Sequence, residues 1–245
     1  LEVLGTRADG YHLLRTGMQS ISLADELLLT RTAEEGITLR CDEPSLPTDG
    51  RNLAFRAAEA VFRHCGLSGG VRIELKKQIP AEAGLGGGSA DAAAVLRGLR
   101  ALFALPLDDE ALRELALPLG ADVPFCVGGG TMLAEGIGEA LSPLPPMPLC
   151  HLVIVKPPCG SSTKAVYAAL LLKTLRPWEQ PDARLLENAL RGQNVTLLGA
   201  SLQNALEKPA TELQPVLLDY RQFLTESGAA GAAMSGSGSA FFAVF

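Results

Sequence analysis

Apolar residues along the first half of the chain follow strand-like spacing in some segments and helix-like spacing in others. Alternation and short apolar runs predict strands at residues 1–4, 21–23, 27–30, 36–40, 71–75 and 131–134. Apolar residues at i, i+3 and i+4 predict helices over residues 52–62 and from Ser89 to Phe103, and a cluster of acidic residues predicts the start of another over 108–116. The chain therefore opens with a β-rich region and continues as a mixture of strands and helices.

A proline run at residues 143–148 cannot continue either a helix or a sheet, and we take it as the domain boundary. It divides the chain into domains at residues 1–145 and 146–245. In the second domain the pattern predicts a strand at 151–155, a helix beginning within 161–167, loop and short helices over 176–195, a helix over 213–226 and a final strand from residue 240.

A glycine-rich loop precedes the helix that begins near Ser89. Gly84, Gly86, Gly87 and Gly88 lie within five residues of one another, and such a loop at a helix N-terminus offers free N–H groups and partial positive charge to a phosphate. The alternative is a surface loop in which Ser89 is only an N-cap. The loop lacks the lysine of a Walker motif and the strand-adjacent spacing of a dinucleotide-binding fingerprint.

Five further residues could carry chemistry, and each has a structural alternative. Lys76 and Lys77 precede the loop and could bind a di- or triphosphate, or simply be solvated. Asp122, two residues before Pro124, is either the N-cap of a short helix or a general base among apolar neighbours. The adjacent rings of Tyr11 and His12 form either a shelf for a planar ligand or a surface turn.

Composition and charge narrow the classes of function. The 245 residues are 47% hydrophobic and 20% charged, and their net charge of −6 argues against a nucleic-acid partner. The five cysteines are odd in number and lack a C-x-x-C spacing, which predicts reduced thiols. Without a long apolar segment or a signal-peptide pattern, we expect no membrane partner and a cytoplasmic location.

Three stretches, taken in order along the chain, resemble the signatures of the GHMP small-molecule kinases. They are Pro80-x-x-x-Gly84-Leu85-Gly86-Gly87-Gly88-Ser89, Leu119–Phe125 and Met234–Gly238. Arg7–His12, the Gly-Leu-Gly-Gly-Gly-Ser form of the loop and Gly136–Glu139 are most similar to the branch of the family that acts on a cytidine-diphosphate-linked methylerythritol. The resemblance covers essentially the whole chain.

The resemblance implies an α+β protein in two lobes, with an S5-like N-terminal domain that binds ATP and a ferredoxin-like C-terminal domain that is incomplete at the chain end. It implies transfer of a phosphoryl group from ATP, with Mg²⁺, to the 2-hydroxyl of the CDP-linked methylerythritol in the non-mevalonate route to isoprenoid precursors. The expected partner is that small molecule, and the expected oligomeric state is a monomer or a homodimer.

Matching positions in the family imply roles for individual residues. Asp122 would be the catalytic aspartate. Tyr11 and Tyr167 would enclose the cytosine, His12 would hydrogen-bond it, and the hydroxyl of Thr163 would lie on the substrate side. The loop containing Gly236 and Ser237 would close the site. ATP would be bound by Pro80, Lys77 and the loop residues Gly84, Leu85, Gly86, Gly87, Gly88 and Ser89.

The sequence departs from the family pattern in a few places. The family carries a lysine and an asparagine upstream of the position matching Leu1 and continues beyond the position matching Phe245, so we expect a truncated chain. Ala90 replaces a hydroxyl residue. Asp91 could help to hold Mg²⁺ or could face away, and we favour the second. Other hypotheses are a GHMP kinase for mevalonate, homoserine or a sugar, and a non-catalytic nucleotide-binding relative.

Overall fold

The computed structural model describes residues 1–170 and 182–245, and these fold into two compact units. Unit 1 comprises Leu1–Gln19, Glu82–Leu85 and Gly130–Phe245, and unit 2 comprises Ser20–Ala81 and Gly86–Gly129. The chain thus passes from unit 1 to unit 2 inside the glycine-rich loop. Unit 1 contains residues from both sides of the boundary expected at residues 145 and 146, and that boundary stays a prediction.

Unit 2 is built on a three-stranded sheet in the order β3-β5-β4. β5 (Gly70–Lys76) lies in the centre, antiparallel to β3 (Glu26–Thr32) and parallel to β4 (Gly36–Cys41). Its alternating residues Val71, Ile73 and Leu75 are buried, as expected for a strand with one face against the core.

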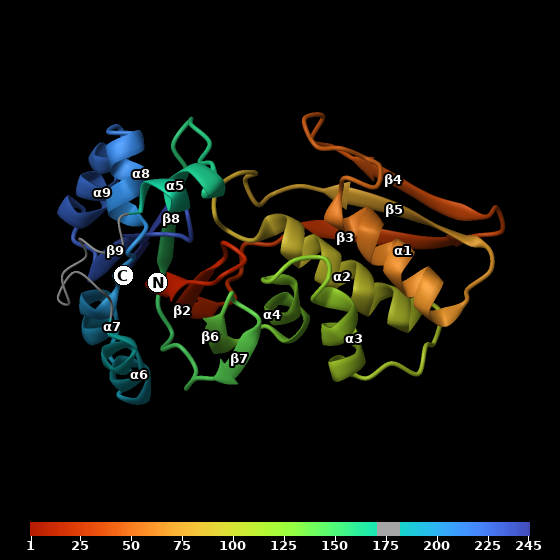
Figure 1. Ribbon diagram of the computed structural model, residues 1–245, viewed down its shortest axis with the longest axis horizontal. Helices are drawn as coiled ribbons and strands as arrows, with labels where there is room; N and C mark the ends of the chain where they lie inside the picture. Colours follow the sequence, from red (N-terminus) through yellow and green to blue (C-terminus); the bar gives the residue numbers. More distant parts are fainter. Residues whose placement is uncertain (171–181) are drawn as a thin grey trace. The chain divides into compact units, whose positions relative to one another are not determined.

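Two helices, α1 (Leu53–Cys65) and α2 (Gly87–Leu102), lie side by side against this sheet (Figure 1). Asn52 caps α1 by accepting a hydrogen bond from the N–H of Ala54 at 2.9 Å, and Gly66 ends the helix in the left-handed conformation. The contact is lined largely by small side chains, which permit close approach of the helices. The buried residues of the two helices are Ala54, Ala57, Ala58 and Val61 on α1, and Asp91, Ala92, Ala93, Val95, Leu96 and Leu99 on α2.

Two shorter helices complete unit 2. α3 (Asp109–Ala116) is capped by Asp108, whose carboxylate accepts a hydrogen bond from the N–H of Ala111 at 2.8 Å. α4 (Val123–Gly128) begins immediately after Asp122, with Pro124 in its first turn. Both helices contact α2, so the helix that starts at the glycine-rich loop also supports the segment that carries Asp122.

Unit 1 contains two antiparallel sheets. The first has the order β1-β2-β6-β7, from β1 (Glu2–Thr6), β2 (His12–Gln19), β6 (Thr131–Gly136) and β7 (Ala140–Pro143). The second has the order β8-β10-β9, from β8 (Leu152–Val155), β10 (Phe241–Val244) and β9 (Gly231–Met234).

Five helices are described in unit 1, namely α5 (Thr163–Ala169), α6 (Ala183–Arg191), α7 (Val195–Ser201), α8 (Glu207–Leu213) and α9 (Leu217–Glu226). α7 and α9 contact the β8-β10-β9 sheet (Figure 1). Phe241, Met234, Leu206 and Leu224 are buried in the same core. With separate sheets and helices in each unit, the expected α+β class is confirmed.

The structure corrects two of the expected elements and adds four that were not predicted, namely β2, β7, α7 and β9. Residues 21–23 form no strand, because the chain has just passed from unit 1 to unit 2 and runs through an irregular segment before β3 begins. The helix expected over 213–226 is interrupted at Pro215, which separates α8 from α9. β2 was not predicted because its sequence HLLRTGMQ lacks alternation. Of the loop and short helices expected over 176–195, residues 176–181 lie outside the described residues.

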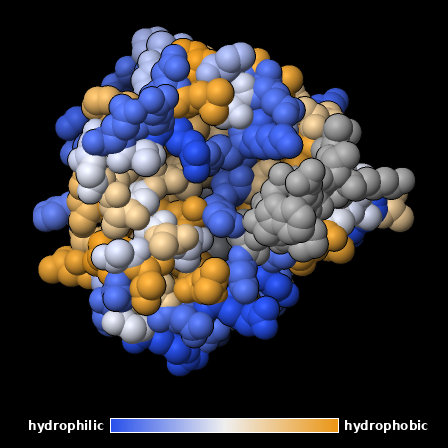
Figure 2. Space-filling view, turned by 90° about the vertical axis from the view of Figure 1, so that its left-hand side faces the viewer, coloured by the Kyte–Doolittle hydropathy of each residue, from blue (hydrophilic) through white to orange (hydrophobic). Residues whose placement is uncertain are grey.

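Several large apolar side chains of unit 1 are exposed on α6 to α9 and the turns beside them. Figure 2 shows hydrophobic residues in orange between hydrophilic residues in blue on the face turned toward the viewer. Such a mixture is ordinary for a protein surface. In the described part of the chain, no helix combines the length and the apolar character that crossing a membrane requires. The exposed residues are Leu185, Leu197, Leu213, Val216, Leu218 and Phe223.

Candidate functional site

The helix end of the glycine-rich loop presents unpaired backbone donors. Gly86 is the N-cap of α2, with φ of 67° and no side-chain capping bond. The N–H groups of Gly87, Gly88 and Ser89 have no hydrogen-bond partner among the described residues, and at a helix N-terminus they carry partial positive charge. Ser89 lies inside the helix, so the alternative in which it is only the N-cap is wrong. This end of the loop can accept an anion.

The entry half of the loop is fixed inside unit 1 by the second glycine-rich segment. The carbonyl of Ala83 accepts a hydrogen bond from the N–H of Ala240 at 3.0 Å, and the carbonyl of Gly84 accepts one from the Ser235 hydroxyl at 2.9 Å. A Cβ at Gly84 would lie 2.2 Å from the Ser235 carbonyl oxygen, and φ of Gly84 is 73°. Only glycine fits at this contact, which brings two of the predicted motifs together.

The segment around Ser237 is held by side chains from other parts of unit 1. The hydroxyls of Thr163 and Ser237 lie 2.8 Å apart, and the Ser161 hydroxyl donates to the Ser237 carbonyl at 2.6 Å. The Asn204 side-chain amide donates to the carbonyls of Met234 and Gly236 at 2.8 and 2.7 Å. A hydrogen bond therefore joins the predicted residues Thr163 and Ser237, while Asn204 fixes the neighbouring Gly236.

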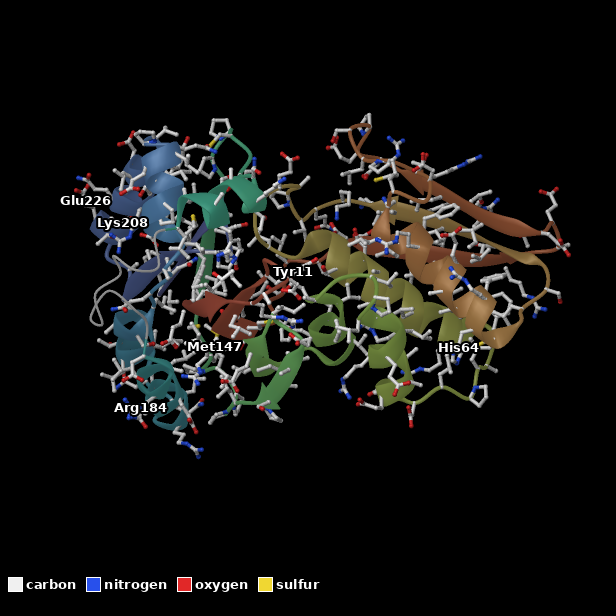
Figure 3. The ribbon with its side chains drawn as sticks, viewed as in Figure 1. Tyr11, His64, Met147, Arg184, Lys208 and Glu226 are labelled. Carbon is white, nitrogen blue, oxygen red and sulfur yellow. The ribbon has the colours of Figure 1, made fainter. Side chains whose placement is uncertain are left out.

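The predicted aromatic residues are only partly brought together. The rings of His12 and Tyr167 have centroids 4.8 Å apart with planes tilted by 33°. Tyr11 lies in the turn before β2, is 61% exposed (Figure 3), and makes no ring contact among the described residues. The two adjacent rings therefore form no common shelf in the structure, and the stacked pair is His12 with Tyr167.

Asp122 occupies the N-cap position of α4 but does not act as a cap. Its backbone is helical, with φ −83° and ψ −16°, and its carboxylate makes no capping bond. It has no ion pair or side-chain hydrogen bond within the described part of the chain. The residue is accessible to solvent, while the surrounding protein disfavours the ionised form, so that desolvation raises the pKa of this carboxyl. An accessible, unpartnered carboxylate with a raised pKa suits a proton acceptor.

Arg97 on α2 fixes the helix that follows Asp122. Its guanidinium donates to the carbonyls of Cys126 and Val127 at 2.5 and 3.0 Å, near the C-terminal end of α4. Burial, together with the Asp122 carboxylate, raises the pKa of the Cys126 thiol to about 12, which keeps this thiol protonated and unreactive.

Lys77 lies between two buried carboxylates in unit 2. Its ammonium is 2.5 Å from Asp25 and 2.8 Å from Asp91. Burial alone would raise the pKa of Asp25 and lower that of Lys77, but their hydrogen bonds outweigh burial, so the pKa of Asp25 is lowered and that of Lys77 is raised. For Asp91 burial dominates and raises its pKa to about 6. The side chain of Asp91 thus points to Lys77.

Three residues that position these groups were not singled out from the sequence: Asp25, Arg97 and Asn204. Each acts through hydrogen bonds to backbone groups distant in the sequence, for which a single sequence carries no periodic or motif signal. Asp25 could be suspected only from its place before an apolar strand.

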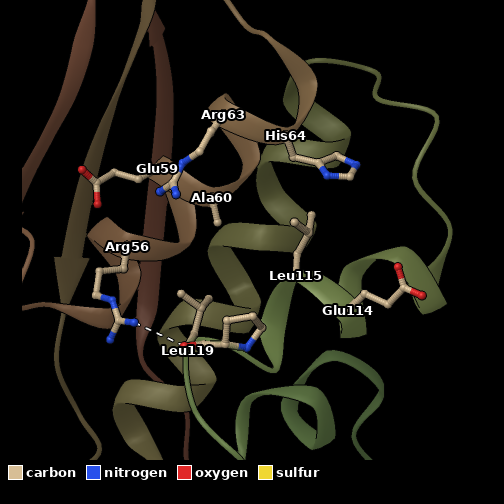
Figure 4. Close-up of a pocket in the computed structure, with 9 residues that line it drawn as sticks. Arg56, Glu59, Ala60, Arg63, His64, Glu114, Leu115 and Leu119 are labelled. Carbon is tan, nitrogen blue, oxygen red and sulfur yellow. Dashed lines mark hydrogen bonds between the residues drawn. The ribbon is translucent and has the colours of Figure 1, made fainter.

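A pocket of about 390 Å³ lies in unit 2 between α1 and α3 (Figure 4). Its lining includes Arg56, Arg63 and His64 from α1, and the Arg56 guanidinium donates to the Pro118 carbonyl at 3.3 Å. None of the catalytic or binding residues expected from the sequence lines this pocket, although Leu119, the first residue of the second signature stretch, does.

Sequence models of the GHMP kinases match the chain in two places. The GHMP kinases N terminal domain matches residues 52–130, and the GHMP kinases C terminal domain matches residues 182–245. The first match contains the glycine-rich loop and Asp122, and the second contains Gly236 and Ser237.

Curated relatives match over the whole chain. A 4-diphosphocytidyl-2-C-methyl-D-erythritol kinase from Acetivibrio thermocellus is 42% identical over 245 residues, which are 100% of this chain and 86% of the relative. The enzyme of the same name from Carboxydothermus hydrogenoformans is 46% identical over 244 residues, covering 100% of this chain and 84% of the relative.

Solved structures agree with these matches. A crystal structure of 4-(cytidine 5'-diphospho)-2C-methyl-D-erythritol kinase superposes with a TM-score of 0.83 and 39% identity, covering 99% of this chain and 85% of that one. A homoserine kinase from Cytophaga hutchinsonii superposes with a TM-score of 0.75 at 24% identity, covering 96% of this chain and 78% of that one. The second likeness concerns the fold alone.

Proposed function

The chain belongs to the GHMP kinases, in the family of the 4-diphosphocytidyl-2-C-methyl-D-erythritol kinases, and from this premise we propose its reaction and site. The proposed reaction transfers the γ-phosphoryl group of ATP to the 2-hydroxyl of 4-diphosphocytidyl-2-C-methyl-D-erythritol. The observation that carries the proposal is identity above 40% over the full chain to kinases named for this substrate. The homoserine kinase, at 24% identity, supports only a common fold.

ATP is the phosphate donor expected of a kinase family, and we assign its phosphates to the glycine-rich loop. The free N–H groups of Gly87, Gly88 and Ser89 would bind the phosphate oxygens, while Gly84, Leu85 and Gly86 shape the loop and Pro80 leads into it. Because the chain carries a net charge of −6, these backbone donors would supply much of the local positive potential.

Asp122 is the proposed catalytic base. Its carboxylate would orient the 2-hydroxyl and accept its proton as the phosphoryl group is transferred. Phosphoryl transfer passes through a loose transition state, so alignment and charge stabilisation contribute most of the rate. The absence of a capping bond leaves this carboxylate available for that role in the described structure.

The remaining predicted residues are assigned to the substrate. Tyr11, His12 and Tyr167 would hold the cytosine, with the His12–Tyr167 pair providing a preformed aromatic surface. Thr163, Gly236 and Ser237 would lie near the methylerythritol, as the matching family positions imply, and a hydrogen bond holds the hydroxyls of Thr163 and Ser237 together.

We propose that Mg²⁺ accompanies ATP and that the enzyme works in the cytoplasm. Magnesium at phosphoryl-transfer sites is bound by substrate phosphates with one or two carboxylates, and it neutralises charge that develops on the phosphates. The proposal places the ion on the ATP phosphates and assigns it no side-chain ligand.

The proposed reaction is tested with Asp122→Asn, which keeps the size of the side chain and removes its basicity. Phosphorylation of the CDP-linked substrate should fall by about a thousandfold or more, because proton acceptance and hydroxyl alignment are both lost. Binding of the CDP-linked substrate, measured by calorimetry, should change little.

The control is Asp108→Asn, at the start of α3, which should retain the wild-type rate. Wild-type turnover by Asp122→Asn would remove Asp122 from the mechanism. Transfer by the wild type to mevalonate or homoserine, with none to the CDP-linked substrate, would overturn the proposed substrate.

A further inference from the structure

The cluster formed by Asp25, Lys77 and Asp91 connects three separate segments of unit 2. Asp25 precedes β3, Lys77 follows β5, and Asp91 lies in the second turn of α2. Their side chains are 2%, 9% and 4% exposed, so the ion pairs are withdrawn from water. A buried pair of this kind is costly to form, and its loss on one side leaves an uncompensated charge.

Asp25 also fixes the backbone that follows Lys77. Its Oδ1 accepts hydrogen bonds from the N–H groups of Gln78 and Ile79 at 2.5 and 2.8 Å, while its Oδ2 accepts from the lysine. One carboxylate therefore fixes both the position of the Lys77 ammonium and the backbone conformation of residues 77–79.

The fixed segment packs directly against the first residue of α2. A Cβ placed on Gly87 would lie 3.0 Å from Ile79 Cγ2 and 3.3 Å from the Lys77 ammonium. Movement of Ile79 or Lys77 would therefore change the position of Gly87, whose N–H is one of the free donors. The contacts run from Asp25 through residues 77–79 to the helix end of the loop.

The charges in the cluster do not favour a second anion. With both carboxylates ionised the three groups sum to −1, and the lysine's positive charge is already compensated at close range. Asp91 Oδ1 is in addition buried without a hydrogen-bond partner in the described structure. The cluster therefore holds a lysine in place more effectively than it offers a cation to phosphate.

We infer that Lys77 is a positioning residue for the phosphate-binding turn, held by Asp25 and Asp91, and that it does not bind the ATP phosphates directly. This inference rests on the proposed function, since it concerns how the same loop is prepared for ATP. It replaces the expectation from the sequence that Lys77 is an ATP ligand.

The two roles predict opposite effects for Asp25→Asn, which keeps the shape of the side chain and removes its charge. If Lys77 were a phosphate ligand, loss of a competing carboxylate would leave ATP binding unchanged or tighten it. If Lys77 is a positioning residue, Asp25→Asn loosens residues 77–79 and weakens ATP binding, as Lys77→Met does. Small misplacements at such sites can cost up to about a hundredfold.

The experiment measures the Kd of a non-hydrolysable ATP analogue by calorimetry for Lys77→Met, Asp25→Asn and the double variant. Each single variant should raise the Kd about tenfold or more. The Kd of the double variant should not exceed the larger of the two single-variant values, because both substitutions remove the same connection. The matched control is Lys76→Met, since Lys76 pairs with Glu26 on the surface, with side chains 62% and 64% exposed. It should stay within about twofold of the wild type.

A second readout does not depend on ATP. Amide hydrogen exchange at Gln78 and Ile79, whose N–H groups donate to Asp25, should be faster in Asp25→Asn than in the wild type and unchanged in Lys76→Met. Should Lys77→Met or Asp25→Asn fail to fold, Asp91→Asn serves in both measurements, with the same expected direction.

The inference would be overturned if a folded Asp25→Asn bound the ATP analogue as tightly as the wild type or more tightly, while Lys77→Met bound it more weakly. Lys77 would then be a direct ligand of the ATP phosphates. Unchanged exchange in Asp25→Asn would overturn it as well. A wild type that does not bind the ATP analogue would instead contradict the proposed function, and the exchange measurement would still decide the role of Asp25.

Discussion

Two aspartates, Asp108 and Asp122, occupy the same position at the starts of two helices but have different roles. Asp108 accepts a hydrogen bond from the N–H of Ala111 and caps α3, whereas Asp122 lies at the same position of α4 without a capping bond. Both sequence contexts are compatible with an N-cap, so the sequence could not distinguish them. The hydrogen bonds make the distinction, and they separate a stabilising carboxylate from one available for chemistry.

This contrast predicts opposite costs for the two alanine variants. Asp108→Ala should lower the free energy of unfolding by about 1 kcal/mol, because a cap is lost. Asp122→Ala should stay within about 0.5 kcal/mol of the wild type, because no bond is lost. Urea unfolding measures both, and a larger loss for Asp122→Ala would show that its carboxylate supports the fold.

Gly84 and Gly86 are expected to differ although both belong to the glycine-rich loop. A Cβ at Gly84 meets the Ser235 carbonyl, while a Cβ at Gly86 meets nothing within 4 Å, and both residues have positive φ. Gly84→Ala should cost about 3 kcal/mol of stability from strain and overpacking, and Gly86→Ala only about 1–2 kcal/mol from strain.

The same space at Gly86 is where the phosphates are proposed to approach. Gly86→Val should therefore raise the KM for ATP far more than the KM for the CDP-linked substrate. Steady-state kinetics with each substrate varied in turn measures this, and equal increases in the two KM values would argue against a phosphate cradle.

Asp91 should make stability depend on pH. Burial raises its pKa from 3.8 to about 6, so between these values the native state holds a proton that the unfolded state has released. This contribution to stability is fully present below pH 3.8 and is lost as the pH rises through about 6.

Because the amide of Asp91→Asn cannot titrate, the difference in the free energy of unfolding between this variant and the wild type should shift in the variant's favour as the pH rises from 4 to 7, by on the order of 1–3 kcal/mol. Urea unfolding of the two proteins at several pH values within this range tests the prediction. Parallel pH profiles would mean that the Asp91 carboxyl is not perturbed.

At the level of elements, α2 supports both the proposed phosphate-binding turn and the proposed catalytic aspartate. Its N-terminus carries the free donors, and Arg97, nearly three turns later, holds the carbonyls at the end of α4. The alanine-rich and leucine-rich face that packs it against α1 was evident from the sequence, because it repeats at helical spacing. The contacts of Arg97 could not be predicted from the sequence, because a lone arginine in a helix has many possible partners.

Arg97→Met should separate these two functions of α2. The expected loss of stability is about 2–3 kcal/mol from two charge-assisted hydrogen bonds, and kcat should fall while the Kd for the ATP analogue stays unchanged. Arg100 also lies on α2 and forms a partly exposed ion pair with Asp109 of α3, so Arg100→Met should have a much smaller effect on both stability and kcat. Equal effects of the two variants on kcat would contradict a positioning role for Arg97.

Sequence reasoning located the helices and strands that carry periodic apolar residues, including α1, α2 and β5, and the two glycine-rich segments. It erred where a local pattern was overridden: residues 21–23 have strand-like composition but belong to an irregular segment before β3, and Pro215 divides a continuous helical pattern. Sequence reasoning could not identify Asp25 and Asn204, because their hydrogen-bond partners are brought near them only by the tertiary fold.

At the level of the whole molecule, family membership and α+β architecture agree, while the assignment of single residues rests on geometry within each unit. The glycine-rich loop belongs to both units, since its first half is bonded to the Ser235 segment and its second half begins α2. Some of the site residues predicted from the family, among them Gly84, His12 and Thr163, make local hydrogen bonds or ring contacts that can be altered one at a time.

The central claim is that the protein recognises the CDP-linked methylerythritol together with ATP. Its most direct test is calorimetric titration of the protein with that compound, with a non-hydrolysable ATP analogue and, for comparison, with homoserine and mevalonate. We predict saturable binding of the CDP-linked compound and the ATP analogue, with no binding of the other two. Binding of the ATP analogue with homoserine or mevalonate, and none of the CDP-linked compound, would contradict the claim.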